Sequence, residues 1–185
     1  MKDSLKLVAV LSLICLVCAF LVATAHRLTA APIAAAEAQR ETAAILAVLP
    51  TATTSVAPTP MRIVIDGAEH IYYETPEGYA IKAIANGYAG QISLMLGFTK
   101  SVDNSAPRFW SYKALSHNET PGLGAHIAGS FVGHVSDRDA FATKWKMTKD
   151  GGDIEPITAA TISSRAVTEA IGHATEIINK ILTAD

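Results

Sequence analysis

The sequence SSRAVTEAIGHATEIINKIL, residues 163–182, has the clearest folding pattern in the chain. Its apolar residues recur at spacings of four and three, which places them on one face of a helix. These residues are Val167, Ile171, Ala174, Ile178 and Ile181. The pattern predicts an amphipathic helix that buries one side against another layer of the domain.

Shorter segments of alternating hydrophobicity precede this helix and predict strands. Gln91–Phe98 alternates most clearly, because its even-numbered residues are all apolar and fall on one face. The other strand candidates are Arg62–Asp66, Ile71–Glu74, Tyr79–Ala85 and Trp110–Ser116. Short strands followed by one long helix predict an α+β fold, in which the helix packs on a mostly antiparallel sheet.

The connections between these segments give three further expectations. Gly67 separates the first two strand candidates and predicts a hairpin. Asp103–Asn104 falls in the connection before the last strand candidate. Phe141 and Trp145 lie four residues apart within Asp139–Met147, a spacing that predicts one face of a short helix.

The N-terminal region contains a run of 19 residues without a charged side chain, residues 7–25. A helix of that length spans about 28 Å, close to the ~30 Å hydrocarbon core of a bilayer. Lys2 and Lys6 precede the run, and Ala23-Thr24-Ala25 is similar to a signal-peptide cleavage site. A removable signal peptide and a membrane anchor are both open, and the length favours the anchor.

The predicted organisation has four parts. Residues 1–6 form a cytoplasmic N-terminus, because basic residues beside a membrane segment favour that side. Residues 7–25 form a transmembrane helix, residues 26–60 a helix and linker, and residues 61–185 an exported domain. Within the third part, the composition of Ile33–Leu49 predicts a helix that stops before Pro50.

Composition and missing motifs exclude several classes of protein. A net charge of −2 argues against nucleic-acid binding. The six histidines lack the paired spacing of a zinc site, so we expect no metal. Cys15 and Cys18 form C-x-x-C within the apolar run, where two apolar residues are favoured over a redox pair. The usual hydrolase, nucleoside triphosphatase and dinucleotide-binding motifs are absent.

Two polar segments rich in glycine or hydroxyl groups could bind a ligand. In HNETPGLGAHI, residues 117–127, Pro121 fixes its φ, while Gly122 and Gly124 permit positive φ and close approach to a ligand. An ordinary turn is the alternative, but a turn does not need Glu119, Thr120 and Leu123 together.

The second segment, DGGDIEPITAATISSRAV at residues 150–167, leads into the C-terminal helix. Its free N–H groups and the helix dipole favour a bound phosphate. One hydroxyl group suffices to cap a helix, so helix capping and phosphate binding both remain open. The hydroxyl residues are Thr158, Thr161, Ser163 and Ser164, with Ala159 and Ala160 between them.

These two segments, preceded by GYAGQISLMLGF at residues 87–98, resemble in their order the FMN-binding domain of the G subunit of the Rnf complex. A related domain occurs in the C subunit of the Na⁺-translocating NADH:quinone reductase. The Rnf protein fits better, because the chain is short and has one N-terminal hydrophobic helix. The resemblance covers roughly Tyr79 to Ile181 and implies that the exported domain binds FMN.

The resemblance also implies a covalent attachment site. In that family, FMN is joined by a phosphoester bond to the last threonine of an [S/T]-G-A-T motif, which here implies Thr161. Ala159 replaces the glycine of the motif, at ~1 kcal/mol or more if its φ is positive. Glu155 replaces the aspartate read by the flavin transferase. The other implied cofactor contacts are Thr158, Ala159, Ala160, Ser163, Glu119, Thr120, Gly122, Leu123 and Gly124.

The implied function is electron transfer within a membrane-bound, ion-translocating ferredoxin:NAD⁺ oxidoreductase. The chain would be a redox subunit of this translocase with no catalytic residue of its own. Its partners would be the other membrane subunits, the flavin transferase and the lipid bilayer, with the domain on the outer face of the cytoplasmic membrane. The alternatives are another membrane or extracellular electron-transfer chain, or a non-redox module that binds an anionic small molecule.

Overall fold

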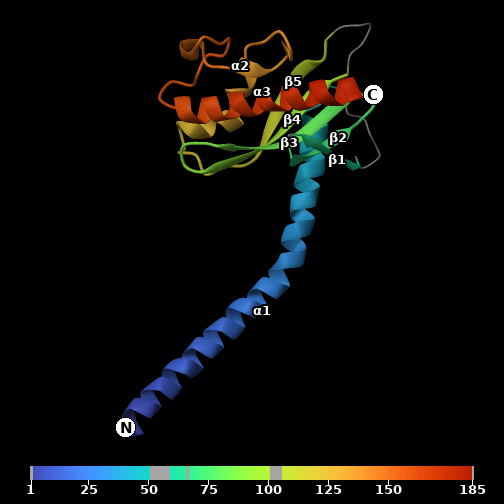
Figure 1. The fold of residues 1–185 in the computed structure, drawn as a ribbon. Coiled ribbons are helices and arrows are strands. Elements are labelled where there is room, and N and C mark those ends of the chain that lie inside the picture. Colours follow the sequence, from blue (N-terminus) through green and yellow to red (C-terminus); the bar gives the residue numbers. More distant parts are fainter. Residues whose placement is uncertain (1, 51–58, 66, 101–105, 185) are drawn as a thin grey trace. The chain divides into compact units, whose positions relative to one another are not determined.

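The computed structural model describes residues 2–50, 59–65, 67–100 and 106–184 (Figure 1). The chain forms two compact units, residues 1–40 and residues 41–185, and each is described by itself. Residues 51–58 of the linker expected up to Pro60, and the connection at Asp103–Asn104, lie outside the described residues, and Pro60 itself begins a strand.

The first unit consists of most of helix α1, Lys2–Ala47. This single helix covers the expected segment at residues 7–25 and most of Ile33–Leu49, and it continues through Pro32. Seven of residues 33–47 are alanine, and this high helix propensity helps to offset the ~3 kcal/mol penalty of an internal proline. Every described side chain from Lys6 to Arg40 is exposed. Among the described helices, α1 is long and apolar enough to cross a membrane.

The second unit contains a six-stranded antiparallel sheet in which each strand pairs with the next along the chain. Gly67, with φ +81°, turns the first hairpin as expected. The strands are β1 Pro60–Ile65, β2 Ala68–Glu74, β3 Gly78–Asn86, β4 Gln91–Thr99, β5 Arg108–Ser116 and β6 Arg138–Asp139. Helix α3, Thr161–Ala184, packs on this sheet (Figure 1). The α+β prediction is therefore confirmed.

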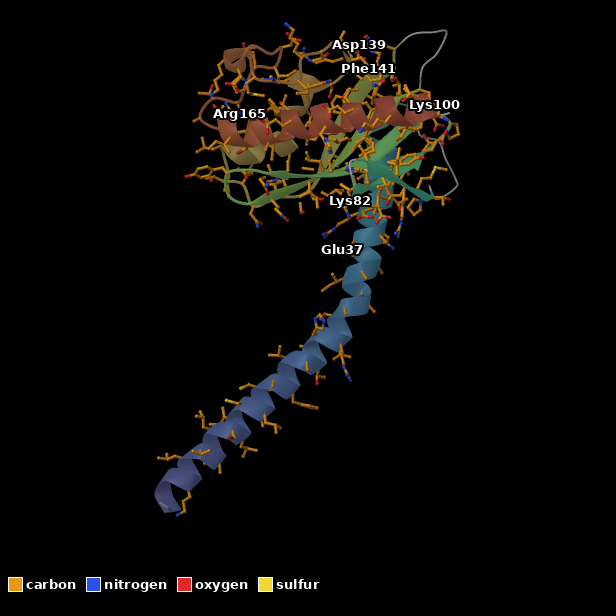
Figure 2. The ribbon with its side chains drawn as sticks, in the orientation of Figure 1. Glu37, Lys82, Lys100, Asp139, Phe141 and Arg165 are labelled. Atoms are coloured by element: carbon orange, nitrogen blue, oxygen red, sulfur yellow. The ribbon has the colours of Figure 1, made fainter. Side chains whose placement is uncertain are left out.

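Each face of the sheet carries its own apolar cluster. The larger cluster lies between α3 and the sheet and includes Phe98, Phe109 and Ile171, none of which has exposed surface. The smaller cluster lies on the opposite face, where Ile45 and Val48 from the end of α1 pack on the sheet. Lys82, labelled in Figure 2, forms an ion pair with Glu41 beside this smaller cluster.

The prediction of a short helix at Asp139–Met147 is wrong. The carboxylate of Asp139 accepts hydrogen bonds from the backbone N–H groups of Phe141 at 2.9 Å and Ala142 at 2.8 Å, which closes a turn. Phe141 is 43% exposed (Figure 2), whereas Trp145 is buried and donates its indole N–H to a backbone carbonyl. Their spacing of four therefore does not place them on one helical face.

Tyr112 on β5 makes the stability of the domain sensitive to alkaline pH. Its buried hydroxyl donates a hydrogen bond to the carbonyl of Ile127, and burial raises the pKa of Tyr112 above the ordinary value of 10.0. The unfolded chain therefore ionises at a lower pH than the folded chain. The contribution of the neutral Tyr112 hydroxyl to the stability of the fold is complete below pH 10 and is lost as the pH rises above 10.

Replacing Tyr112 with phenylalanine is expected to lower the free energy of unfolding by about 1–2 kcal/mol at pH 8, because the Ile127 carbonyl loses its donor. Above pH 10 the variant should lose less stability than the wild type. Urea unfolding of the detergent-solubilised chain at several pH values measures both effects. If the variant loses stability above pH 10 as steeply as the wild type, another group causes that loss. Tyr73 is one such group, because burial also raises the pKa of Tyr73.

Candidate functional site

A cavity of about 450 Å³ lies where three segments of the domain meet. They are the turn between β3 and β4, the loop after β5, and the first turn of α3 with the residues before it. The volume falls within the range of small-molecule sites. The lining residues are Tyr88, Glu119, Thr120, Leu123, Gly124, Ala159, Ala160, Thr161, Ile162 and Ser163.

The hydroxyl residues at the start of α3 differ in position. Thr161 is the first residue of the helix, is partly exposed and lines the cavity. Ser164 is buried and fixes the helix start, because its Oγ accepts from the Ile157 N–H and donates to the Ala160 carbonyl, both at 3.0 Å. Thr158 is exposed and does not line the cavity. Only some of the expected cluster therefore faces a ligand.

Ala159 has a φ of +62°, in the left-handed region that disfavours residues with a Cβ. The penalty expected for alanine at the glycine position of the motif is therefore present. Ala160, the next residue, is buried and outside that region. The backbone conformation therefore favours glycine at position 159 but not at position 160.

Replacing Ala159 with glycine is expected to raise the free energy of unfolding by about 0.5–1 kcal/mol. Glycine relieves the left-handed strain, and the greater freedom of the unfolded chain offsets part of the gain. Ala160→Gly is the matched control and should destabilise the protein, because its φ gives glycine no advantage. Urea unfolding of both variants tests this. Equal losses in the two variants would show that Ala159 is not strained in solution.

The two glycines of the loop after β5 serve different purposes. Gly122 has φ +75° within a turn in which the Thr120 carbonyl accepts the N–H groups of Leu123 at 3.2 Å and Ala125 at 3.1 Å. Gly124 does not use the positive φ that glycine permits, and it leaves room for the buried carboxylate of Glu119. Gly122 itself does not line the cavity.

Glu119 contacts both other segments of the site. Its side chain is buried, with 4% of the residue exposed. Oε2 accepts a hydrogen bond from the Ser163 hydroxyl at 2.5 Å, and Oε1 accepts one from the Ala89 N–H at 3.1 Å. The carboxylate thus joins the loop to the start of α3 and to the β3–β4 turn.

Sequence reasoning missed two residues that line the cavity, Tyr88 and Ile162. They are 72% and 49% exposed, and Leu123 on the loop is 44% exposed. Large apolar side chains are uncommon in an exposed turn and at an exposed helix start, which is the pattern that could have identified them. We call the side chains of Tyr88, Leu123 and Ile162 the apolar rim of the cavity.

Arg165 lies close to the start of α3 but does not line the cavity (Figure 2). Its guanidinium donates to the Asp150 carboxylate at 2.7 Å, and this hydrogen bond raises the pKa of Arg165. The described lining of the cavity therefore has no cationic side chain. An anionic group bound there would depend on backbone N–H groups and hydroxyls.

Comparison with known proteins finds a match to the FMN-binding domain family over residues 87–176, which includes every residue that lines the cavity. The chain is 38% identical over 114 residues to the ion-translocating oxidoreductase complex G subunit of Vibrio atlanticus, covering 57% of this chain and 51% of that protein. It is 39% identical over 105 residues to the corresponding G subunit of Aliivibrio fischeri, covering 52% of this chain and 47% of that protein.

A third relative matches over nearly its whole length. The G subunit of Methanosarcina acetivorans is 28% identical over 186 residues, which cover 96% of each chain. By contrast, the chain spans about half the length of the Vibrio atlanticus and Aliivibrio fischeri relatives. The chain thus contains a match to the FMN-binding domain family at residues 87–176, and it has homologues named as G subunits of ion-translocating oxidoreductase (Rnf) complexes.

Proposed function

We propose that this chain is a membrane-anchored electron carrier whose FMN is joined covalently to Thr161 by a phosphoester bond. The observation that carries the proposal is the position of Thr161. Thr161 is the first residue of α3, and its partly exposed side chain lines the same cavity as the loop after β5. This loop contains ETPGLG at residues 119–124 and is called the ETPGLG loop below. The hydroxyl that would hold the phosphate and the residues that would contact the ring therefore share one site.

The start of α3 fits the phosphate end of FMN. The first N–H groups of an α-helix have no carbonyl partner within the helix, and the positive end of its dipole favours an anion. A phosphodiester on Thr161 keeps one negative charge, which these groups would stabilise. Thr158 is exposed outside the cavity lining and is the weaker candidate for attachment.

The rest of the cavity fits the flavin ring. Tyr88, Leu123 and Ile162 offer exposed apolar surface, and planar aromatic rings pack well against such side chains. Ala159 and Ala160 add small side chains to the same lining. When bound, FMN supplies the electron transfer, while these residues orient the ring and limit its contact with water.

Helix α1 supports attachment to a membrane. The proposal keeps residues 1–6 in the cytoplasm, residues 7–25 in the bilayer, residues 26–60 as helix and linker, and residues 61–185 as the FMN-binding domain on the outer face. The chain would act as a redox subunit beside the other membrane subunits of an Rnf-type complex. Ion movement would belong to those partners.

The test is co-expression of the full chain with a flavin transferase. After denaturation, we expect flavin fluorescence that stays with the protein band in a gel. Mass spectrometry should find an FMN phosphoester on the peptide that contains Thr161. An unmodified peptide in protein purified from its native host would overturn the covalent attachment. Co-purification with membrane redox subunits tests the assignment to a complex.

A further inference from the structure

We propose that Glu119 is the positioning residue of this site and that its fixed negative charge lowers the reduction potential of the bound flavin. The inference deepens the proposed function and rests on it. It starts from the observation that one buried carboxylate accepts hydrogen bonds from both of the other segments that line the cavity.

The hydrogen bonds of Glu119 reach the two other segments that line the cavity. Ala89, which donates to Oε1, follows Tyr88 in the β3–β4 turn. Ser163, which donates to Oε2, lies two residues after Thr161 in the first turn of α3. Because each oxygen accepts a separate donor, a carboxylate satisfies both bonds, whereas an amide has only one acceptor oxygen. Glu119 therefore fixes the distance between the apolar rim and the attachment hydroxyl.

Two glycines keep the space that this carboxylate occupies. A Cβ at Gly87 would lie 2.2 Å from Oε1 of Glu119. A Cβ at Gly124 would lie 2.6 Å from Oε2 and 2.8 Å from the Ser163 Oγ. Neither glycine has a positive φ, so backbone conformation does not explain them. Their lack of a side chain is what admits the carboxylate.

Glu119 is the one charged side chain among the described residues that line the cavity. A negative charge in a poorly solvated site opposes the arrival of further negative charge, because the effective dielectric constant is low. Reduction adds electrons to the flavin ring. A carboxylate fixed beside the ring therefore makes reduction less favourable and lowers the potential.

The experiment compares Glu119→Gln with Glu169→Gln in the full chain co-expressed with a flavin transferase. Glu169 is an exposed carboxylate on α3 outside the cavity. We expect Glu119→Gln to attach FMN and to show a midpoint potential more positive than the wild type. Glu169→Gln should leave the potential unchanged. Equal potentials in Glu119→Gln and the wild type would overturn the electrostatic role.

A second measurement needs no flavin and tests the positioning role separately. Ser163→Ala keeps the charge of Glu119 but removes one hydrogen bond, so it should fold. In protein made without the transferase, we expect amide hydrogen exchange to rise at least tenfold at residues 119–125 and at the start of α3. Unchanged exchange there would overturn the positioning role. A wild-type chain that never accepts flavin would instead overturn the proposed function alone.

Discussion

Replacing Thr161 with alanine is expected to abolish covalent flavin attachment, because alanine has no hydroxyl to form the phosphoester bond. Thr158→Ala is the matched control, since Thr158 belongs to the same motif but lies outside the cavity lining. It should retain its flavin. Both variants are co-expressed with the transferase, denatured and compared by in-gel fluorescence and peptide mass.

Loss of flavin in the Thr161 variant will not reflect unfolding. Ser164 fixes the start of α3 through the Ile157 N–H and the Ala160 carbonyl, and both bonds survive the change. The loss of one hydroxyl at a helix start costs about 0.5–2 kcal/mol, and the thermal midpoint of the variant will show this cost. Fluorescence that persists in Thr161→Ala, but disappears in Thr158→Ala, would move the attachment site to Thr158.

Replacing Gly97 with alanine is expected to lower the free energy of unfolding by about 3 kcal/mol, the largest stability effect we predict. Gly97 lies on β4 beneath the end of α1. A Cβ there would lie 1.9 Å from the carbonyl oxygen of Val48 and 2.9 Å from its Cβ. Because the obstacle is backbone, relief requires Val48 and its neighbour Ile45 to move off the sheet.

Gly133→Ala is the matched control for this prediction. Gly133 lies in the short helix α2, Val132–Val135, and a Cβ there meets no atom within 4 Å. The change should leave stability unchanged or raise it by about 0.5–1 kcal/mol, because alanine favours helices. Urea unfolding of both variants in detergent measures the difference. A loss at Gly97 no larger than at Gly133 would mean that the end of α1 does not pack on the sheet in solution.

The elements that sequence predicted best are those whose burial repeats along the chain. The buried face of α3 and the face of β4 that lies against it are apolar throughout, so their residues recur with the period of a helix or a strand. The other face of β4, at Met95 and Gly97, is also buried, which the alternation did not predict. Asp139–Met147 was predicted wrongly for a local reason. The Asp139 carboxylate caps a single turn, but the Lys144 N–H donates to the Asp153 carboxylate and the Ala140 carbonyl accepts the Trp145 indole N–H. These groups are therefore not available to continue a helix.

The site was harder to predict because pairing of distant segments creates it. Thr161 and the ETPGLG loop could be identified from residue types and from the family resemblance. A large apolar side chain in a turn makes Tyr88 unusual, but its place in this cavity follows only from the fold, in which the Ala89 N–H donates to Glu119. The role of Gly124 was also hidden, since it depends on the space required by a side chain five residues earlier.

The order of elements along the chain determines when this site comes into existence. Helix α3 follows every strand of the sheet, so the ribosome makes Thr161 after the turn at Tyr88 and the loop at Glu119. A nascent or prematurely terminated chain has those two segments but lacks the hydroxyl and the helix N–H groups. Under the proposed function, attachment therefore follows the synthesis of Thr161, and an attached flavin would mark a chain that was translated at least as far as the start of α3.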